Sequence, residues 1–202
     1  MTRLFLDCEW ADVIGRELVS LAVVSADGQQ RFYAEASPLP SQPTDFVRHV
    51  VYPLLDHGWW ATPRHEITQR LRAFLSGIDA PVVIYDHQVD GALLSYVLDG
   101  FDLPSNVVDA CGPHPAPRRW PVSGDVNLSA LIEAYFAAHP EVAGRRHHAG
   151  VDAGALRQAW CALAGLITTD WSDRAIARLR QQHWPATVID PETTTDVKSA
   201  MP

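Results

Sequence analysis

Short apolar runs of strand length dominate the first part of the chain. The run from Arg3 to Cys8 predicts a buried strand, and Leu18 to Ser25 is a second, Val-rich run. A third run from Gln30 to Ala34 follows a turn signal at Asp27-Gly28, which favours a hairpin. We therefore expect three antiparallel strands to open the fold.

Further along, strand-like runs alternate with apolar residues at helical spacing. Ala80 to Tyr85 is a continuous apolar run, typical of a central strand covered on both faces, and Val107 to Ala110 predicts a fifth strand. The Pro-rich segments 37–44 and 111–125 are expected to be loops. A helix is expected to begin at Asp45, with Phe46, Val47 and Val50 on one face. A second helix is expected to run from Pro63 to Gly77 after an N-cap at Thr62. Further helices are expected at 91–98, 128–138 and 151–166, and a last one from a cap at Ser172 to Leu179.

This order of elements predicts an α/β fold. Antiparallel strands followed by strand–helix units are typical of a mixed sheet flanked by helices. The length of 202 residues suits a single domain, which we place at residues 1–189. Residues 190–202 lack an apolar pattern and are expected to form a flexible tail.

The chain carries a net charge of −8. This balance argues against nonspecific coating of a polyanion, since phosphate contacts need Lys and Arg. Carboxylates that bind divalent cations would supply both the negative charge and a bridge to phosphate. The three cysteines form no C-x-x-C pair, and no apolar run approaches the ~20 residues of a membrane span. We expect a cytoplasmic protein with reduced thiols and no membrane partner.

Two carboxylates close the first predicted strand. In Asp7-Cys8-Glu9 the acids are two residues apart, so in a strand both side chains lie on one face and can share a cation. The triplet alone also fits ordinary surface charge, but unpaired charge at the end of a buried strand is costly unless a cation compensates it. Asp90 follows the next strongly apolar strand, where it could cap a helix, join the pair, or do both.

A fourth carboxylate accompanies a histidine pair near the carboxyl end. Asp152 lies five positions after His147, and a helix that begins near Ala149 would turn Asp152 toward the sheet while His147 sits on a mobile lead-in. The simpler interpretation of His147 and His148 is a solvated pair on a loop. Four converging carboxylates favour Mg²⁺ or Mn²⁺ over zinc.

These residues resemble the three motifs of a known family. Asp7-x-Glu9, Asp90 within Y-D-x-x-x-D-x-x-x-L, and H-x-A-x-x-D-A from His147 to Ala153 are similar to the motifs of the DEDDh 3′-5′ exonucleases. This ribonuclease T-like and oligoribonuclease-like branch belongs to the ribonuclease H-like superfamily. The resemblance covers residues 3–164, with the motifs in the family's order, and it implies a ribonuclease H-like mixed sheet.

The resemblance also implies a mechanism. Asp7, Glu9, Asp90 and Asp152 would hold two Mg²⁺ or Mn²⁺ ions, and His147 would take the proton from an attacking water. Two ions ~4 Å apart stabilise the attacking and leaving oxygens of an in-line displacement, and an imidazole with a pKa near ~6.5 suits a general base. Nucleoside 5′-monophosphates would be released from a 3′ end.

Two positions depart from the family pattern. Asp86 stands where an amide is common and adds negative charge near the metals, and Val89 stands where an aromatic is common. Both departures bear on substrate geometry rather than on the metal site. The H-x-A-x-x-D spacing selects His147 over His148 as the base.

The candidate substrate contacts are one aromatic residue and four arginines. Trp10 directly follows the carboxylate pair and could stack on the terminal base, a contact worth ~1–3 kcal/mol, or pack in the core. The arginines fall in predicted loops on the side of the site, where they could contact phosphates or be merely solvated. They are Arg118, Arg119, Arg145 and Arg146.

Our first hypothesis is an exoribonuclease that acts on single-stranded RNA 3′ ends, because a compact chain without polymerase domains resembles the RNA-trimming members of the family. A 3′-5′ DNA exonuclease is the alternative activity. A nonenzymatic module that binds nucleic acid or protein is the alternative class. Homodimers are common in the family, so a homodimer is a further expectation.

Overall fold

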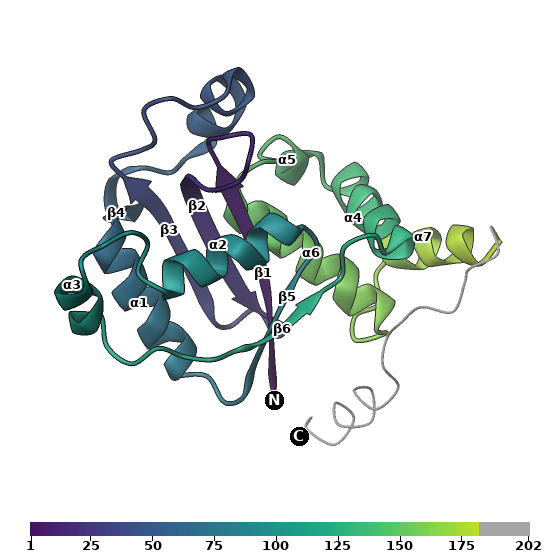
Figure 1. Ribbon diagram of the computed structural model, residues 1–202. Coiled ribbons are helices and arrows are strands. Elements are labelled where there is room, and N and C mark those ends of the chain that lie inside the picture. The colour runs from purple at the N-terminus through teal and green to yellow at the C-terminus, as the bar shows by residue number, and fades with distance from the viewer. Residues whose placement is uncertain (182–202) are drawn as a thin grey trace.

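The computed structural model describes residues 1–181, and its centre is a six-stranded mixed sheet (Figure 1). The strands, in the order β4-β3-β2-β1-β5-β6, are β1 (Thr2–Trp10), β2 (Leu18–Ser25), β3 (Arg31–Ser37), β4 (Ala61–Pro63), β5 (Pro81–Tyr85) and β6 (Arg118–Pro121). Antiparallel pairing joins β1, β2 and β3, whereas β5 is parallel to β1 and β6, and β4 is parallel to β3. The expected α/β mixed sheet with an antiparallel opening is confirmed, and it is consistent with a ribonuclease H-like fold.

Helices cover both faces of the sheet. The α-helices of the described residues are α1 (Arg64–Ser76), α2 (Gln88–Leu98), α3 (Ser105–Ala110), α4 (Val126–Ala138), α5 (Pro140–Ala143), α6 (Ala149–Leu163) and α7 (Asp170–Gln181). α1 and α2 pack on one face and α6 on the other, where α4 and α7 pack against α6 (Figure 1). Across residues 1–181, no helix has the length and apolar character that crossing a bilayer requires.

Strand β1 lies between the two hydrophobic layers. Leu4 and Leu6 belong to the layer of α1 and α2, while Phe5 belongs to the layer of α6, as the two-residue period of a strand requires. Because Asp7 and Glu9 continue the face of Phe5, β1 delivers both carboxylates to the side of the sheet that α6 covers.

Several expected elements lie where the apolar pattern placed them. The hairpin turns at Asp27-Gly28, where Gly28 adopts a φ of 76° that favours glycine. Strand β5 ends at Tyr85 as expected, and α6 begins at Ala149. The expected domain end at 189 and the tail from 190 lie outside the described residues.

The segment after Asp45 is helical as expected, although its geometry and its buried face differ. Val47–Val51 forms a π-helix and Tyr52–Leu54 a 3-10 helix. Val47 and Val51 are buried, whereas Phe46 is 51% exposed. The expected apolar face with Phe46 is therefore wrong, because the wider π turn changes which residues share a side.

The expected strand at Val107–Ala110 is wrong. These residues belong to α3, which follows Pro104 and is tied to its neighbours through the backbone oxygen of Val108. The sixth strand instead forms within the expected loop 111–125, where Arg118–Pro121 pairs parallel to β5. The β-branched residues Val107 and Val108 favour a strand, but tertiary contacts decide the conformation of so short a segment.

Two predicted helix caps are also wrong. Thr62 lies in β4, and its hydroxyl donates to the backbone oxygen of Trp60 at 2.8 Å, so α1 starts after Pro63 without a side-chain cap. Ser172 lies inside α7, where its backbone N–H donates to the hydroxyl of Thr169 at 3.3 Å. Thr169, just before the helix, therefore takes the capping role that Ser172 was expected to have.

A buried guanidinium joins the helices on the α1 face. Arg72 in α1 is 5% exposed, and it donates hydrogen bonds of 2.7–3.2 Å to the backbone oxygens of Leu98, Val108 and Gly112. These acceptors belong to the end of α2, to α3 and to the loop that follows α3. The side chain thus holds three segments together through hydrogen bonds to their backbone oxygens, of which that of the buried residue Leu98 accepts two.

Replacing Arg72 by Leu is expected to lower the free energy of unfolding by about 3 kcal/mol, because buried carbonyl groups lose their donor. Urea unfolding followed by circular dichroism measures the change. Arg174→Leu is the matched control, since Arg174 is exposed on α7 and its loss should change stability by less than about 0.5 kcal/mol. Equal stability of the two variants would contradict the role of Arg72.

Candidate metal centre

The site lies where two parallel strands separate. The pairing of β1 with β5 ends at Phe5 and Ile84, and the chain beyond each residue carries carboxylates. Asp7 and Glu9 follow on β1, and Asp86 directly follows the last residue of β5. Crevices outside the carboxyl ends of strands are where α/β sheets commonly bind ligands.

Asp90 joins this crevice from the first turn of α2. One carboxylate oxygen accepts a hydrogen bond from the backbone N–H of His87 at 3.2 Å, and His87, not Asp90, is the N-cap of α2. The other oxygen accepts from the backbone N–H of Cys8, also at 3.2 Å. Asp90 thus both completes the capping box and bridges α2 to the middle of the D-x-E triplet.

The remaining predicted residues come from the start of α6. Asp152 lies in the first turn, and its Oδ2 accepts a hydrogen bond from the backbone N–H of His147 at 2.9 Å. His147 has a φ of 73°, a left-handed conformation that few side chains other than glycine adopt. This backbone turn brings the imidazole back toward Glu9 and Asp152.

The side chains form two neighbouring groups whose ligand atoms lie within 4.8 Å of one another in each group. One group is Asp7, Asp86 and Asp90, and the other is Glu9, His147 and Asp152. The five residues predicted as the catalytic set are thus distributed over both groups. Asp86 was expected only to add charge nearby, but the structure gives it the same proximity to Asp7 as Asp90 has.

Two carboxylate oxygens of the site are buried without a hydrogen-bond partner. They are Oδ2 of Asp7 and Oδ1 of Asp152, one from each group. Buried polar atoms in proteins normally have a partner, so an orphaned oxygen needs an explanation. A cation bound between the carboxylates would satisfy both atoms.

Burial and mutual repulsion raise the pKa values of the carboxyl groups. Burial, followed by the charges of Asp90 and Asp152, holds the pKa of Asp7 well above its usual range. Burial and neighbouring carboxylates raise the pKa of Glu9 to about 9 and that of Asp90 to about 8. Burial also raises the pKa of Asp152 to about 6. Without a cation, the folded site favours protonated carboxyl groups.

Burial has the opposite effect on the histidine. It lowers the pKa of His147, and the nearby positive charge of Arg146 lowers that pKa further. The imidazole is therefore neutral at pH 7 and able to accept a proton. Phe46 packs edge-on against the ring, with centroids 5.0 Å apart, and so restricts its orientation.

The lead-in to α6, expected to be mobile, is held by hydrogen bonds. His148 caps α6 because its Nδ1 accepts from the backbone N–H of Gly150 at 3.1 Å. Its Nε2 is then the protonated nitrogen, and it lies 3.3 Å from Oδ2 of Asp56. Arg145 donates to the other oxygen of Asp56 at 2.6 Å. Asp56 therefore binds the segment on either side of His147.

A buried carboxylate on β3 fixes Asp56 in turn. Glu35 is 1% exposed, and it accepts hydrogen bonds from the backbone N–H groups of Asp56 at 2.7 Å and His57 at 2.9 Å. The hydroxyl of Tyr33 donates to Glu35 at 2.8 Å, and its ring stacks on His148. No sequence signal had pointed to Glu35 or Asp56, because their partners are far away in the chain.

Trp10 lies beside the site, but part of its surface is already engaged. Its ring is half-buried against the core and stacks on His87, with centroids 5.1 Å apart. Core packing and proximity to the carboxylates are therefore both features of this side chain. Stacking on a substrate base stays a prediction.

The four candidate arginines do not gather at the site. Arg118 and Arg119 lie in β6 rather than in a loop, and Arg118 pairs with Val82 near the amino ends of the strands, away from the carboxylates. The expected loop position of these two is wrong, because residues 118–121 add to the sheet. Arg145 is bound to Asp56, and Arg146 forms a two-point ion pair with Glu133.

The raised pKa values predict how stability depends on pH. Each carboxyl group is protonated in the folded chain at a pH where the unfolded chain has lost the proton, so stability present at low pH is lost as the pH rises. The loss extends through the folded values of about 6, 8 and 9 for Asp152, Asp90 and Glu9. We expect the metal-free protein to unfold at lower temperature at pH 9 than at pH 6, and saturating Mn²⁺ to reduce this difference.

The matched variants are Asp7→Asn and Asp79→Asn. Asn at position 7 removes a repelling charge, so it should raise the unfolding temperature in a chelator at pH 8 and weaken the stabilisation by Mn²⁺. Asp79 is 92% exposed, and its loss should change neither quantity appreciably. Thermal unfolding in both conditions makes the comparison, and an Asp7→Asn variant less stable than the parent in chelator would contradict it.

Comparison of the sequence with known protein families and with curated proteins gives no match to either.

Proposed function

We propose that this protein is a divalent-metal-dependent 3′-5′ exonuclease that releases nucleoside 5′-monophosphates from single-stranded RNA ends. The proposal rests on one observation above the others: Asp7 carries a buried, unpartnered oxygen among carboxylates from β1, α2 and α6 and the residue after β5. A carboxylate cluster of this kind is stable at neutral pH when cations compensate its charge.

The side chains present suit Mg²⁺ or Mn²⁺. Asp7, Asp86 and Asp90 would hold one ion, and Glu9 and Asp152 would hold a second, since hard cations prefer oxygen ligands. Such ions neutralise the developing charge on a phosphodiester and lower the pKa of a bound water. The proposal keeps the four metal ligands expected from the sequence and adds Asp86 to them.

His147 is left as the general base. Its lowered pKa leaves one ring nitrogen unprotonated at neutral pH, and Phe46 and the Asp152 hydrogen bond restrict the position of the residue. The imidazole would accept a proton from the attacking water as the phosphodiester bond breaks. The carboxylates are less suited to accept this proton, because the bound cations would offset their negative charge.

Direct cleavage assays test the activity. With Mg²⁺ or Mn²⁺, 3′-labelled RNA should release a labelled mononucleotide at once, whereas 5′-labelled RNA should give a ladder of shortening products. His147→Ala should lower kcat by roughly 10²–10⁴-fold, and Asp79→Asn should leave it unchanged. Full activity of Asp7→Asn or of Asp152→Asn would overturn the proposed site.

The sugar of the substrate separates the alternatives. DNA and RNA of one sequence, compared in the same assay, distinguish an exoribonuclease from a DNA exonuclease, because only RNA carries the 2′-hydroxyl. A protein that binds no Mn²⁺ and leaves every oligonucleotide intact would instead be a nonenzymatic module. The homodimer expected from the family resemblance and the cytoplasmic location stay predictions.

Asp86 can be tested separately from the activity. Asp86→Asn keeps the shape of the side chain and removes its charge, so it should weaken the binding of one Mn²⁺ ion by roughly 10–100-fold. Isothermal titration calorimetry measures this affinity, with Asp79→Asn as the control. Parental Mn²⁺ affinity in Asp86→Asn would show that Asp86 contributes only nearby charge.

A further inference from the structure

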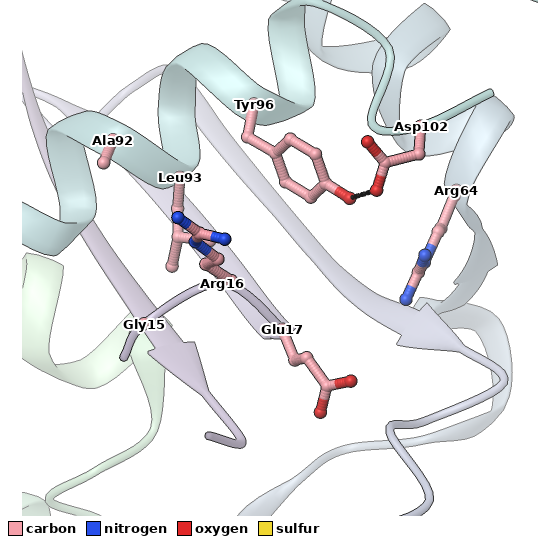
Figure 2. A pocket seen from close by; sticks show the side chains of 8 residues that line it. All are labelled: Gly15, Arg16, Glu17, Arg64, Ala92, Leu93, Tyr96 and Asp102. Atoms are coloured by element: carbon pink, nitrogen blue, oxygen red, sulfur yellow. Dashed lines mark hydrogen bonds between the residues drawn. The ribbon is translucent and has the colours of Figure 1, made fainter. Parts of the chain in front are cut away.

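A pocket of about 520 Å³ lies between the β1–β2 loop, one side of α2 and the start of α1 (Figure 2). This volume is within the range of sites for small organic molecules. The side chains that define its chemistry are Arg16, Glu17, Arg64, Leu93, Tyr96 and Asp102.

The pocket and the metal centre are both bordered by α2. Asp90 and Leu93 belong to the same helix, three residues apart, which is about 4.5 Å along its axis. Gly15, at the rim, packs so closely on Val89 that a Cβ atom there would lie 2.5 Å from a methyl carbon of Val89. A polymer whose end occupies the metal centre and which runs along α2 would therefore pass this pocket.

The β1–β2 loop that presents Arg16 and Glu17 is fixed in shape. The carboxylate of Asp12 accepts hydrogen bonds from the backbone N–H groups of Arg16 at 2.8 Å and Glu17 at 2.9 Å. Gly15 has a φ of 71°, which glycine adopts without strain. The loop thus offers its two charged side chains to the pocket without having to fold on binding.

Two guanidinium groups in the lining are free to bind an anion. Within residues 1–181, neither Arg16 nor Arg64 forms an ion pair with a carboxylate; Arg64 lies over the ring of Phe101, 5.5 Å from its centroid. On the other side of the metal centre, Arg145 and Arg146 already bind Asp56 and Glu133. The guanidinium groups that are free to contact a bound strand therefore lie on the α2 side of the metal centre.

The rest of the lining suits a base and a sugar. The Tyr96 ring lines the pocket, and its hydroxyl donates to Asp102 at 2.5 Å (Figure 2). An edge contact with Phe101 also holds the ring in place. Glu17 and Asp102 offer acceptors for hydroxyl and amino groups. Apolar contact, cations and acceptors together match the parts of a nucleotide.

We propose that this pocket binds the nucleotide unit on the 5′ side of the one being cleaved, with its phosphate on Arg16 and Arg64 and its base against Tyr96. The inference rests on the proposed nuclease function and adds a substrate subsite to it. It places the strand along α2 rather than along α6.

The test compares oligonucleotides with a mononucleotide. In a His147→Ala background with Mn²⁺, fluorescence anisotropy measures the binding of a labelled RNA pentamer to Arg16→Ala, Arg64→Ala and the double variant. Each single change should weaken pentamer binding by about tenfold and reduce the salt slope of log K by about 0.7. The affinities for Mn²⁺ and for a nucleoside 5′-monophosphate should not change.

Arg174→Ala on α7 is the matched control, because it removes the same charge from an exposed position far from the pocket in sequence. Arg16→Lys should restore part of the affinity if charge is what matters. Pentamer affinities within twofold of the parent in both alanine variants would overturn the subsite while leaving an active nuclease intact. A parent that binds neither Mn²⁺ nor pentamer would overturn the subsite and the proposed function together.

Discussion

The cost of burying carboxylates that repel one another governs this structure. Asp7 lies in the central strand with an unpartnered oxygen, and every charged neighbour that raises its pKa is itself acidic. A fold selected only for stability would replace such a residue, since removal of buried repulsion is favourable. Its presence means that the surrounding elements must hold the acids together against their repulsion. The stability needed for this comes from the apolar layers on either side of β1.

The elements that hold the site are rigid and distributed. β1 is fixed by partners on both edges, α2 is fixed by its capping box, and the start of α6 is bound through Asp56 and Glu35. Glu35 is more deeply buried than Asp7, but it accepts three hydrogen bonds, so its charge is satisfied by the protein. The contrast separates an acid whose oxygens the protein satisfies from one with an oxygen that no protein group satisfies.

The sequence was sufficient for those parts of the site that obey a local period. The two-residue spacing of Asp7 and Glu9 places both on one face of a strand. The start of α6 could be located because apolar residues at helical spacing begin near Ala149. These features need only neighbouring residues. The alternation of strands and helices likewise predicted the α/β mixed sheet, because apolar runs of strand length and helical spacing are both local patterns.

The rest depends on contacts between segments far apart in the chain. Asp86 could not be assigned because the direction of a side chain just beyond a strand is set by how β5 leaves the sheet. Arg118 was misplaced for a related reason: four residues in a Pro-rich segment became a strand only because the edge of β5 was available. The pairing of Asp56 with His148 joins positions 92 residues apart, and no periodicity reports such a contact.

The charge distribution has one further consequence under the proposed function. With a net charge of −8 and five carboxylates at the centre, the metal-free site repels a phosphodiester, and the free cationic groups beside it are few. Phosphate attraction must then come mainly from the bound ions, so metal binding and strand binding are coupled in the same direction. Cations that reduce the repulsion among the acids also supply the attraction for the substrate. Under the proposed function, the buried acids that destabilise the metal-free site would therefore be the same groups that make strand binding depend on the metal.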